Sequence, residues 1–372
     1  MKDKHPVKIF TLLLLVALFI LLVACNNSSN NSDNGNNSDN DNNNEQQQIE
    51  AKVTDYYPIK PNAKYTYVGT GNEFASYTVY VDYTLEDKVQ YKKVNPGTHV
   101  AEIVSVKNGQ VTKLYTQGEA YYREDYLRNP NLITLNKEEI LLKEPLKSGN
   151  SWNLPDGTKA TITKIDAQVN VGQGSFMAME VTKEEIDGSK TVNYYAKGVG
   201  LVKSTFIVNG IEEVVIGLQK LEENAKNTID IRFYYPNVND DKIYYLNSKI
   251  SYQTNDITRK KIEEAYKSTL TDALKSQGLI RVLTPNTKIN FLYLTKNNVV
   301  RTDISQDFIK ELNLGAGYES LVLKSLTNTL AGYYNTDMVH LTVANDNYSS
   351  GHIYLEDFQY LYADFNNTVE LK

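Results

Sequence analysis

The segment TRKKIEEAYKSTLTDALKSQG, residues 258–278, decides the fold class of the second half of the chain. Its apolar residues recur at the 3.6-residue spacing of an amphipathic helix and form one stripe: Ile262, Ala265, Tyr266, Thr269, Leu270, Ala273 and Leu274. Asp256 or Thr258 can cap the start of the helix, and Gly278 can end it in a left-handed conformation. We therefore expect one helix here, which excludes an all-β arrangement for this region.

Segments with strand character surround this helix: 229–235, 243–252, 289–294, 299–304, 339–343 and 353–355. Ser305 can cap a short helix that runs to Leu312, and residues 321–333 are apolar on most sides, which predicts a buried helix. The resulting order, β-β-α-β-β-α-β-β, predicts a compact α+β domain over residues 228–360 with its helices on one face. Residues 361–372 are expected to be a C-terminal tail.

Residues 51–223 are rich in strand signals, and helical periodicity is weak. Strands are expected at 65–68, 77–83, 99–106, 111–115, 160–165, 176–181 and 192–196. Tight turns are expected at Asn108-Gly109, Asp187-Gly188 and Asn209-Gly210. This pattern predicts an antiparallel β domain, and it leaves open a curved sheet, an open barrel or a sandwich. A polar join near residues 222–227 separates it from the α+β domain, and few contacts are expected to cross this join.

Tyrosine is the unusual residue in the composition, with 28 copies against 10 phenylalanines and 1 tryptophan. Tyrosine suits half-buried strands, because the ring packs while the hydroxyl stays hydrated. The alternative is a set of aromatic platforms for a glycan or a peptide. A deep pocket lined by Tyr65, Tyr77, Tyr80 or Tyr195 favours ligand binding in the β domain.

The first 25 residues have the layout of a targeting segment. A basic start with Lys2, Lys4 and Lys8 precedes an apolar run that ends in Leu22-Val23-Ala24-Cys25. This ending resembles the lipobox of bacterial lipoproteins. The resemblance implies a signal peptide over residues 1–24, lipid attachment at Cys25 and a location on the extracytoplasmic face of the cell membrane. An uncleaved anchor is the alternative, and it also places residues 26–372 outside that membrane.

Residues 25–50 are dominated by Asn, Ser, Asp and Gln, which predicts a disordered tether. Without residues 1–24 the chain has 36 basic and 44 acidic residues, a net charge of −8. A chain of this sign is a poor partner for nucleic acid or an anionic lipid surface. We therefore expect contact with the membrane only through acylated Cys25.

Several segments of the second half resemble, in order, the GerMN domain of sporulation and germination proteins: IRFYY (231–235), LTPNTK (283–288), NVVRTDIS (298–305), SLTNTL (325–330) and VHLTV (339–343). Two departures are Asn286 in place of a glycine and Asn345-Asp346-Asn347 in the last hairpin, which we expect to be irregular. The resemblance implies a membrane-anchored protein that acts by assembly with protein partners and not by chemistry.

No pattern of residues indicates catalysis. His99, His340 and His352 lie far apart in the sequence, each in a segment with strand character, and none has the spacing of a metal site. We expect no enzyme activity, no cofactor and no metal. The leading hypothesis is a non-enzymatic envelope lipoprotein that scaffolds or stabilises a protein assembly. The alternative is an envelope lipoprotein that binds a lipid or a cell-wall fragment in its β domain.

Overall fold

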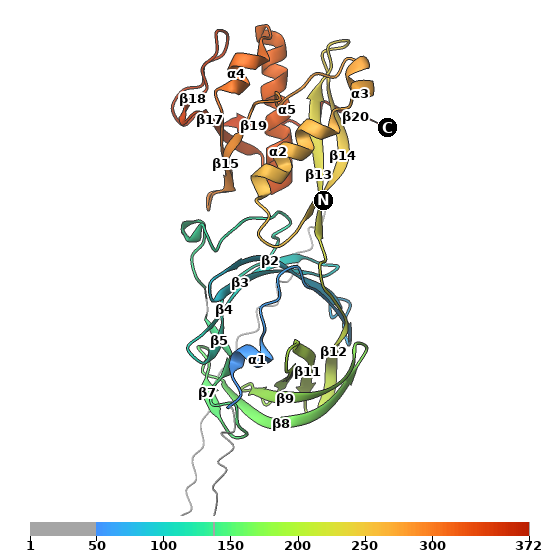
Figure 1. Ribbon diagram of the computed structural model, residues 1–372, viewed down its shortest axis with the longest axis vertical. Coiled ribbons are helices and arrows are strands. Elements are labelled where there is room, and N and C mark those ends of the chain that lie inside the picture. The colour runs from blue at the N-terminus through green and yellow to red at the C-terminus, as the bar shows by residue number, and fades with distance from the viewer. Residues whose placement is uncertain (1–49, 137, 372) are drawn as a thin grey trace, which may run out of the picture.

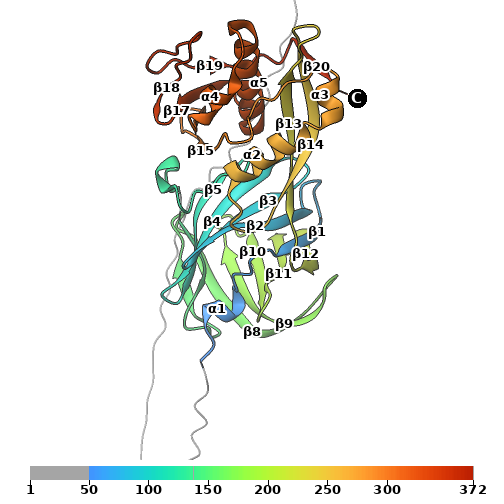
Figure 2. The ribbon, with the colours of Figure 1, turned by 45° about the horizontal axis from the view of Figure 1, so that its top comes forward.

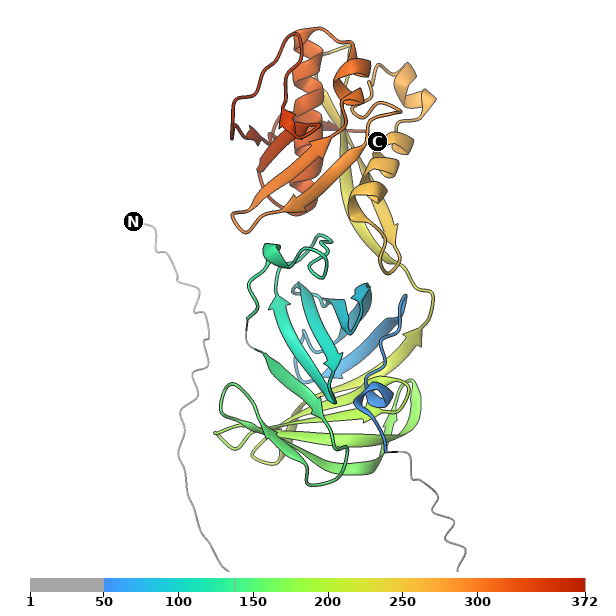
Figure 3. The same ribbon diagram turned by 60° about the vertical axis from the view of Figure 1, so that its left-hand side comes forward.

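The computed structural model describes residues 50–136 and 138–371 (Figure 1). The expected signal peptide, Cys25 and nearly all of the expected tether lie outside the described residues. The chain forms a β domain, residues 50–222, and an α+β domain, residues 227–371, stacked along the long axis of the molecule (Figures 1 and 3). In the part of the chain that the structure describes, no helix has the length and apolar character needed to cross a membrane.

The β domain is built on one antiparallel sheet, which contains twelve strands within the described residues. The strands are β1 Lys64–Thr70, β2 Tyr77–Leu85, β3 Lys88–Val94, β4 His99–Lys107, β5 Gln110–Gln117, β6 Glu139–Lys143, β7 Ser151–Asn153, β8 Lys159–Val171, β9 Gly174–Glu184, β10 Lys190–Ala196, β11 Gly200–Val208 and β12 Ile211–Glu222. Their order is β6-β5-β4-β3-β2-β1-β12-β11-β10-β9-β8-β7. The sheet curves until its two edges, β6 and β7, approach each other.

Side chains bridge these two edges. The indole Nε1 of Trp152 on β7 donates to the Ile140 carbonyl on β6 at 2.9 Å, and Asn150 Nδ2 donates to the Lys143 carbonyl at 2.8 Å. The sheet is therefore nearly closed, which agrees with the predicted curved sheet or open barrel and not with the predicted sandwich (Figure 1). A short helix, α1 (Val53–Tyr56), lies within the outline of this ring.

The predicted strands and tight turns of the β domain are present. Asn108-Gly109 joins β4 to β5 with φ angles of 53° and 69°, as a two-residue hairpin requires. The sequence did not reveal β3, β6, β7, β11 and β12. Strand β3, KVQYKKV, lacks the alternation of apolar and polar residues that a strand with one exposed face shows. Its polar residues Gln90 and Lys92 are buried on the outer face of the sheet.

The α+β domain contains β13 Asn227–Pro236, β14 Ile243–Tyr252, α2 Thr258–Thr269, α3 Asp272–Ser276, β15 Ile289–Leu294, β16 Val299–Ile304, α4 Asp307–Leu312, α5 Ala316–Tyr334, β17 Met338–Val343, β18 Asp346–Asn347, β19 Leu361–Tyr362 and β20 Thr368–Glu370. Among the described residues, its strands form two sheets, β13-β14-β20 and β15-β16-β17-β18, with β19 paired to β17. Helix α5 packs against strands of both sheets. The prediction of helices on one face is corrected, because the buried helix α5 has strands on more than one side.

The predicted helix at 258–278 is two helices. Helix α2 ends at Thr269, and the Thr271 side chain accepts from Leu274 N–H to start α3, a local bond that competes with helix continuation. Gly278 follows with φ at 92°, as expected. The capping predictions at the start are wrong: Ile257 is the N-cap, and the Thr258 hydroxyl bonds with the Tyr83 hydroxyl at 2.8 Å.

Other predictions for this domain also need correction. Gln306, not Ser305, is the N-cap of α4, because the Ser305 hydroxyl accepts from Lys288 N–H instead. Residues 353–355 form no strand within the described part of the chain, apart from one isolated bridge between Ser349 and Tyr354.

The last hairpin and the C-terminal residues complete the domain. In the β17–β18 turn, both Ala344 and Asn345 have positive φ, and β18 is only two residues long. The segment expected as a tail, 361–372, differs from the prediction because β19 pairs with β17, and β20 pairs parallel to β14. Residues 361–362 and 368–370 therefore belong to the sheets of the α+β domain.

Candidate functional site

The concave face of the β domain forms a partly open cavity of about 250 Å³. Strands from both halves of the curved sheet contribute to it, together with Tyr57 and Pro58 directly after α1. Six tyrosines line the cavity: Tyr57, Tyr65, Tyr67, Tyr77, Tyr91 and Tyr195. They converge because alternate residues of a strand point to the same face of its sheet.

The tyrosine rings pack against one another around the cavity. The Tyr67 and Tyr77 rings stack with their centroids 4.7 Å apart, and the Tyr57 ring lies 6.4 Å from Tyr91 and 6.5 Å from Tyr195. The Tyr67 hydroxyl donates to the Leu201 carbonyl at 2.9 Å. These contacts fix the positions of flat apolar ring faces with polar edges.

Burial raises the pKa of all six phenols, to about 12 for Tyr65. At neutral pH the hydroxyls are therefore protonated and can both donate and accept hydrogen bonds.

Four charged residues lie on one part of the cavity wall. Lys113 and Glu139, on β5 and β6, form an ion pair with Nζ and Oε2 2.5 Å apart. The Lys93 ammonium lies 3.8 Å from the Tyr77 ring centroid, and burial lowers the pKa of Lys93 while Glu102 opposes this shift. Glu102 makes no hydrogen bond or ion pair with the described residues, and its charge adds to the raised pKa of Tyr57, Tyr77 and Tyr91.

The opposite face of β2 and β3 carries a second polar site, the joint between the two domains. On β3, Tyr91 and Lys93 point into the cavity, while Gln90 and Lys92 are buried on the other face. A β-bulge between Val81 and Tyr83 places Asp82 and Tyr83 on that outer side. The cavity and the joint therefore share the same two strands.

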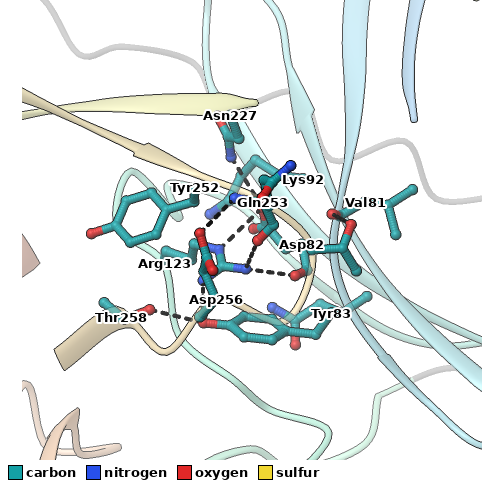
Figure 4. A network of polar contacts seen from close by, with 12 residues as sticks. Val81, Asp82, Tyr83, Lys92, Arg123, Asn227, Tyr252, Gln253, Asp256 and Thr258 are labelled. Atoms are coloured by element: carbon teal, nitrogen blue, oxygen red, sulfur yellow. Dashed lines mark hydrogen bonds and ion pairs between the residues drawn. The ribbon is translucent and has the colours of Figure 1, made fainter. Parts of the chain in front are cut away.

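Arg123 is at the centre of the joint (Figure 4). Its side chain is 0% exposed, and its Nε lies 3.5 Å from Oδ1 of Asp82, which is 1% exposed. The guanidinium donates to the carbonyls of Asp82 at 2.6 Å and Gln253 at 3.0 Å, and to the carbonyl of Asp256. One cation thus binds backbone from both domains.

Aromatic rings and amides complete the environment of Arg123. The guanidinium carbon lies 4.0 Å from the Tyr83 ring centroid and 4.8 Å from that of Tyr252 (Figure 4). Asn227 Nδ2 donates to Asp82 Oδ1 at 3.0 Å, at the start of the α+β domain. Because the charge is paired, hydrogen-bonded through its terminal nitrogens and covered by rings, the cost of burying it is offset in part.

The loop that carries Arg123 is itself held by β3. Lys92 Nζ donates to the carbonyls of Ala120 at 2.5 Å and Tyr122 at 2.6 Å, and Gln90 bonds both Glu124 O and Tyr126 N. Tyr122 belongs to the hydrophobic core of the α+β domain. The expectation of few contacts across the join is therefore wrong, because a loop of the β domain contributes to the core of its neighbour.

Glu124 is a further buried titratable residue of the joint. Its carboxylate accepts from Leu294 N–H at 3.2 Å, from Asp125 N–H at 3.2 Å and from the Tyr334 hydroxyl at 3.3 Å. Burial nevertheless raises the pKa of Glu124 to about 8, since these bonds oppose the desolvation without cancelling it. Burial also lowers the pKa of Lys92 to about 8.

The structure tests the predicted tyrosine pocket residue by residue. Tyr65, Tyr77 and Tyr195 line the cavity, as the pocket hypothesis requires. Tyr80 does not, because it is on the other face of β2 and borders the joint. Tyr57, Tyr67 and Tyr91 were missed, although the Tyr65-Thr66-Tyr67 alternation indicated that Tyr65 and Tyr67 share one face.

The three histidines do not come together into one site. The His99 ring packs on Tyr121 at 5.0 Å, and the His340 ring lies 6.0 Å from Tyr360. His352 is in a bend and not in the predicted strand. Within residues 50–136 and 138–371, no group of three or more His, Cys, Asp or Glu side chains is placed to hold a metal ion.

The structure thus defines an extended two-domain protein with a small α+β module joined to a curved β domain. Residues 232–349 match the family model described as "Germane: Sporulation and spore germination". This match confirms the predicted GerMN resemblance of the second half of the chain and relates it to sporulation and germination proteins. No curated protein matches the chain.

Solved structures show partial similarity to the chain. A Bacteroides fragilis protein with a YmcC-like fold is 12% identical over 45% of this chain and 98% of its own, with a TM-score of 0.27. The first GerMN domain of the Bacillus subtilis sporulation protein GerM is 19% identical over 35% of this chain and 95% of its own, with a TM-score of 0.26. The tandem GerMN domains of the same protein are 18% identical over 35% of this chain and 45% of theirs, also with a TM-score of 0.26.

Replacing Arg123 tests the joint. We expect Arg123→Met to lower the free energy of unfolding of the full chain by about 3–5 kcal/mol, because the buried carboxylate of Asp82 loses the cation that pairs with it. Arg128→Met, in the same loop, should cost about 1 kcal/mol or less, because the Arg128–Asp125 ion pair is partly exposed. Urea unfolding followed by circular dichroism measures both, and equal losses would contradict a central role for Arg123.

Replacing Glu124 tests the raised pKa. Unfolded Glu124 ionises near pH 4.5 and folded Glu124 near pH 8, so the folded state binds the extra proton between these values. The contribution of Glu124 to stability is therefore largest below pH 4.5 and is lost as the pH rises to about 8. Urea unfolding at pH 5 and pH 8 measures this decrease in the free energy of unfolding. We expect the decrease to be absent in Glu124→Gln. Glu119→Gln, an exposed change in the same loop, should show the same decrease as the wild type.

Proposed function

We propose that this protein is a non-enzymatic envelope lipoprotein that scaffolds or stabilises a protein assembly linked to sporulation or germination. The observation that carries the proposal is the match of residues 232–349 to a sporulation and spore germination family. In this proposal Cys25 is acylated and holds the protein on the extracytoplasmic face of the cell membrane, and the α+β domain contacts protein partners.

The arrangement of the two domains is consistent with this division of roles. The described chain begins on the side of the β domain that faces away from the α+β domain (Figures 2 and 3). A membrane anchor before residue 50 would leave the α+β domain as the part of the molecule that extends farthest from the bilayer. The rigid joint at Arg123 would hold it there.

The α+β domain exposes aromatic side chains on one short segment, residues 354–365. Phe358 is 72% exposed and Tyr362 is 62% exposed, and Tyr354, Tyr360 and Phe365 are also exposed. Exposed aromatic residues that lie close together are typical anchors of protein–protein contacts. We therefore assign this segment as the contact surface for a protein partner in the assembly.

Replacing Phe358 and Tyr362, two strongly exposed aromatic residues of this segment, tests this surface. We expect the double variant Phe358→Ser, Tyr362→Ser to weaken partner binding by more than about tenfold. Aromatic side chains that become buried when a partner binds contribute most of the binding energy of an interface. Crosslinking in intact sporulating cells measures capture of the partner. Ile211→Ser, an equally exposed apolar change on the β domain, is the matched control. Loss of crosslinking only in the Ile211 variant would contradict the assignment.

Replacing Cys25 tests the anchor. We expect Cys25→Ala to move the protein from the membrane fraction to the soluble fraction, because acyl chains contribute about 0.8 kcal/mol of membrane affinity per buried methylene. Fractionation of the variant and palmitate labelling of the wild type measure this. An unlabelled wild-type protein would exclude lipid attachment at Cys25.

The tyrosine-lined cavity favours a second function for the β domain, the binding of a small envelope ligand. Three of the four tyrosines that the sequence indicated for such a pocket line it. A partner assembly and a bound ligand do not compete, because the cavity and the exposed aromatic segment are on different domains.

A further inference from the structure

We propose that the cavity of the β domain binds a neutral saccharide, which deepens the second proposed function by naming the class of ligand. The sequence alone left a lipid and a cell-wall fragment as equal alternatives. The walls of the cavity distinguish between them.

The apolar part of the wall consists of aromatic rings. Tyr67 and Tyr77 are stacked, and the Tyr57 ring packs near both Tyr91 and Tyr195. Flat rings of this kind pack against the apolar C–H faces of a sugar ring, while their hydroxyls can bond its oxygen atoms. All six phenols remain protonated at neutral pH. The Tyr67 hydroxyl already donates to the Leu201 carbonyl and can only accept from a ligand, whereas a phenol whose proton is not used in this way can donate.

The polar part of the wall argues against an alkyl chain. Lys93, Glu102, Lys113 and Glu139 all line the cavity. An acyl chain would displace their water and supply no hydrogen bond, which is costly for charged groups. A ligand with several hydroxyl groups replaces those water contacts. Glu102 in particular has carboxylate oxygens without a hydrogen-bond donor among the described residues.

The charges of the wall also favour a neutral ligand. Lys113 and Glu139 pair with each other, and Lys93 lies against the Tyr77 ring with Glu102 close enough to influence its pKa. Two cations and two anions leave no excess of either sign. The cavity volume of about 250 Å³ is sufficient for one sugar ring with its substituents.

The test is titration of the full chain with N-acetylglucosamine and its dimer, and separately with palmitate. Saturation-transfer NMR and calorimetry measure binding. We expect the saccharides to bind, and we expect Glu102→Gln and Tyr77→Ala each to weaken that binding by about tenfold or more. Two controls should bind as the wild type does: Tyr80→Ala, on the other face of the same strand, and Glu213→Gln, an exposed change on β12. Circular dichroism checks that each variant is folded.

Three other outcomes would contradict the proposal. Palmitate binding that depends on Tyr77, without saccharide binding, would overturn the saccharide class and leave ligand binding by the β domain in place. Binding of neither probe would overturn both. Saccharide binding that is equal in the wild type, the cavity variants and the controls would show that the sugar binds elsewhere.

Discussion

The buried guanidinium of Arg123 holds the two domains in one arrangement. It lies on a loop of the β domain, pairs with Asp82 of β2 and donates to backbone carbonyls of the α+β domain. A buried cation needs its partners in fixed positions, because losing any one of them leaves an uncompensated charge or carbonyl in a dry environment. This requirement makes the joint selective for a single geometry, whereas an apolar contact of the same size tolerates sliding.

The same two strands serve the joint and the cavity. Period-2 alternation along β3 sends Tyr91 and Lys93 into the cavity and sends Gln90 and Lys92 to the loop that carries Arg123. The bulge at Asp82 turns that residue and Tyr83 toward the α+β domain. A change in the cavity wall therefore acts on strands whose outer face is fixed to the neighbouring domain, which gives a short physical connection between the cavity and the α+β domain.

The many tyrosines of this chain have several roles. In the cavity, ring faces and hydroxyls form a lining suited to a polar ring-shaped ligand. At the joint, Tyr83 and Tyr252 cover the guanidinium of Arg123. In the α+β domain, Tyr235 and Tyr266 pack in the core and bond backbone carbonyls through their hydroxyls. Phenylalanine cannot replace tyrosine in these roles, since each one uses the ring and the hydroxyl together.

The sequence by itself determined the features that depend on neighbours in the chain. The stripe from Ile262 to Leu274 predicted helical structure, and Asn108-Gly109 predicted a hairpin, because helices and tight turns are specified by residues a few positions apart. Only the tertiary structure decided that the loop around Arg123, which has the polar character of a solvated loop, is buried. Its partners Asp82, Gln253 and Asp256 are 41, 130 and 133 positions away. The cavity likewise required the sheet to curve until Tyr65 and Tyr195 lined the same space. Contacts of such separation arise from how strands close and domains dock, which local propensity does not encode.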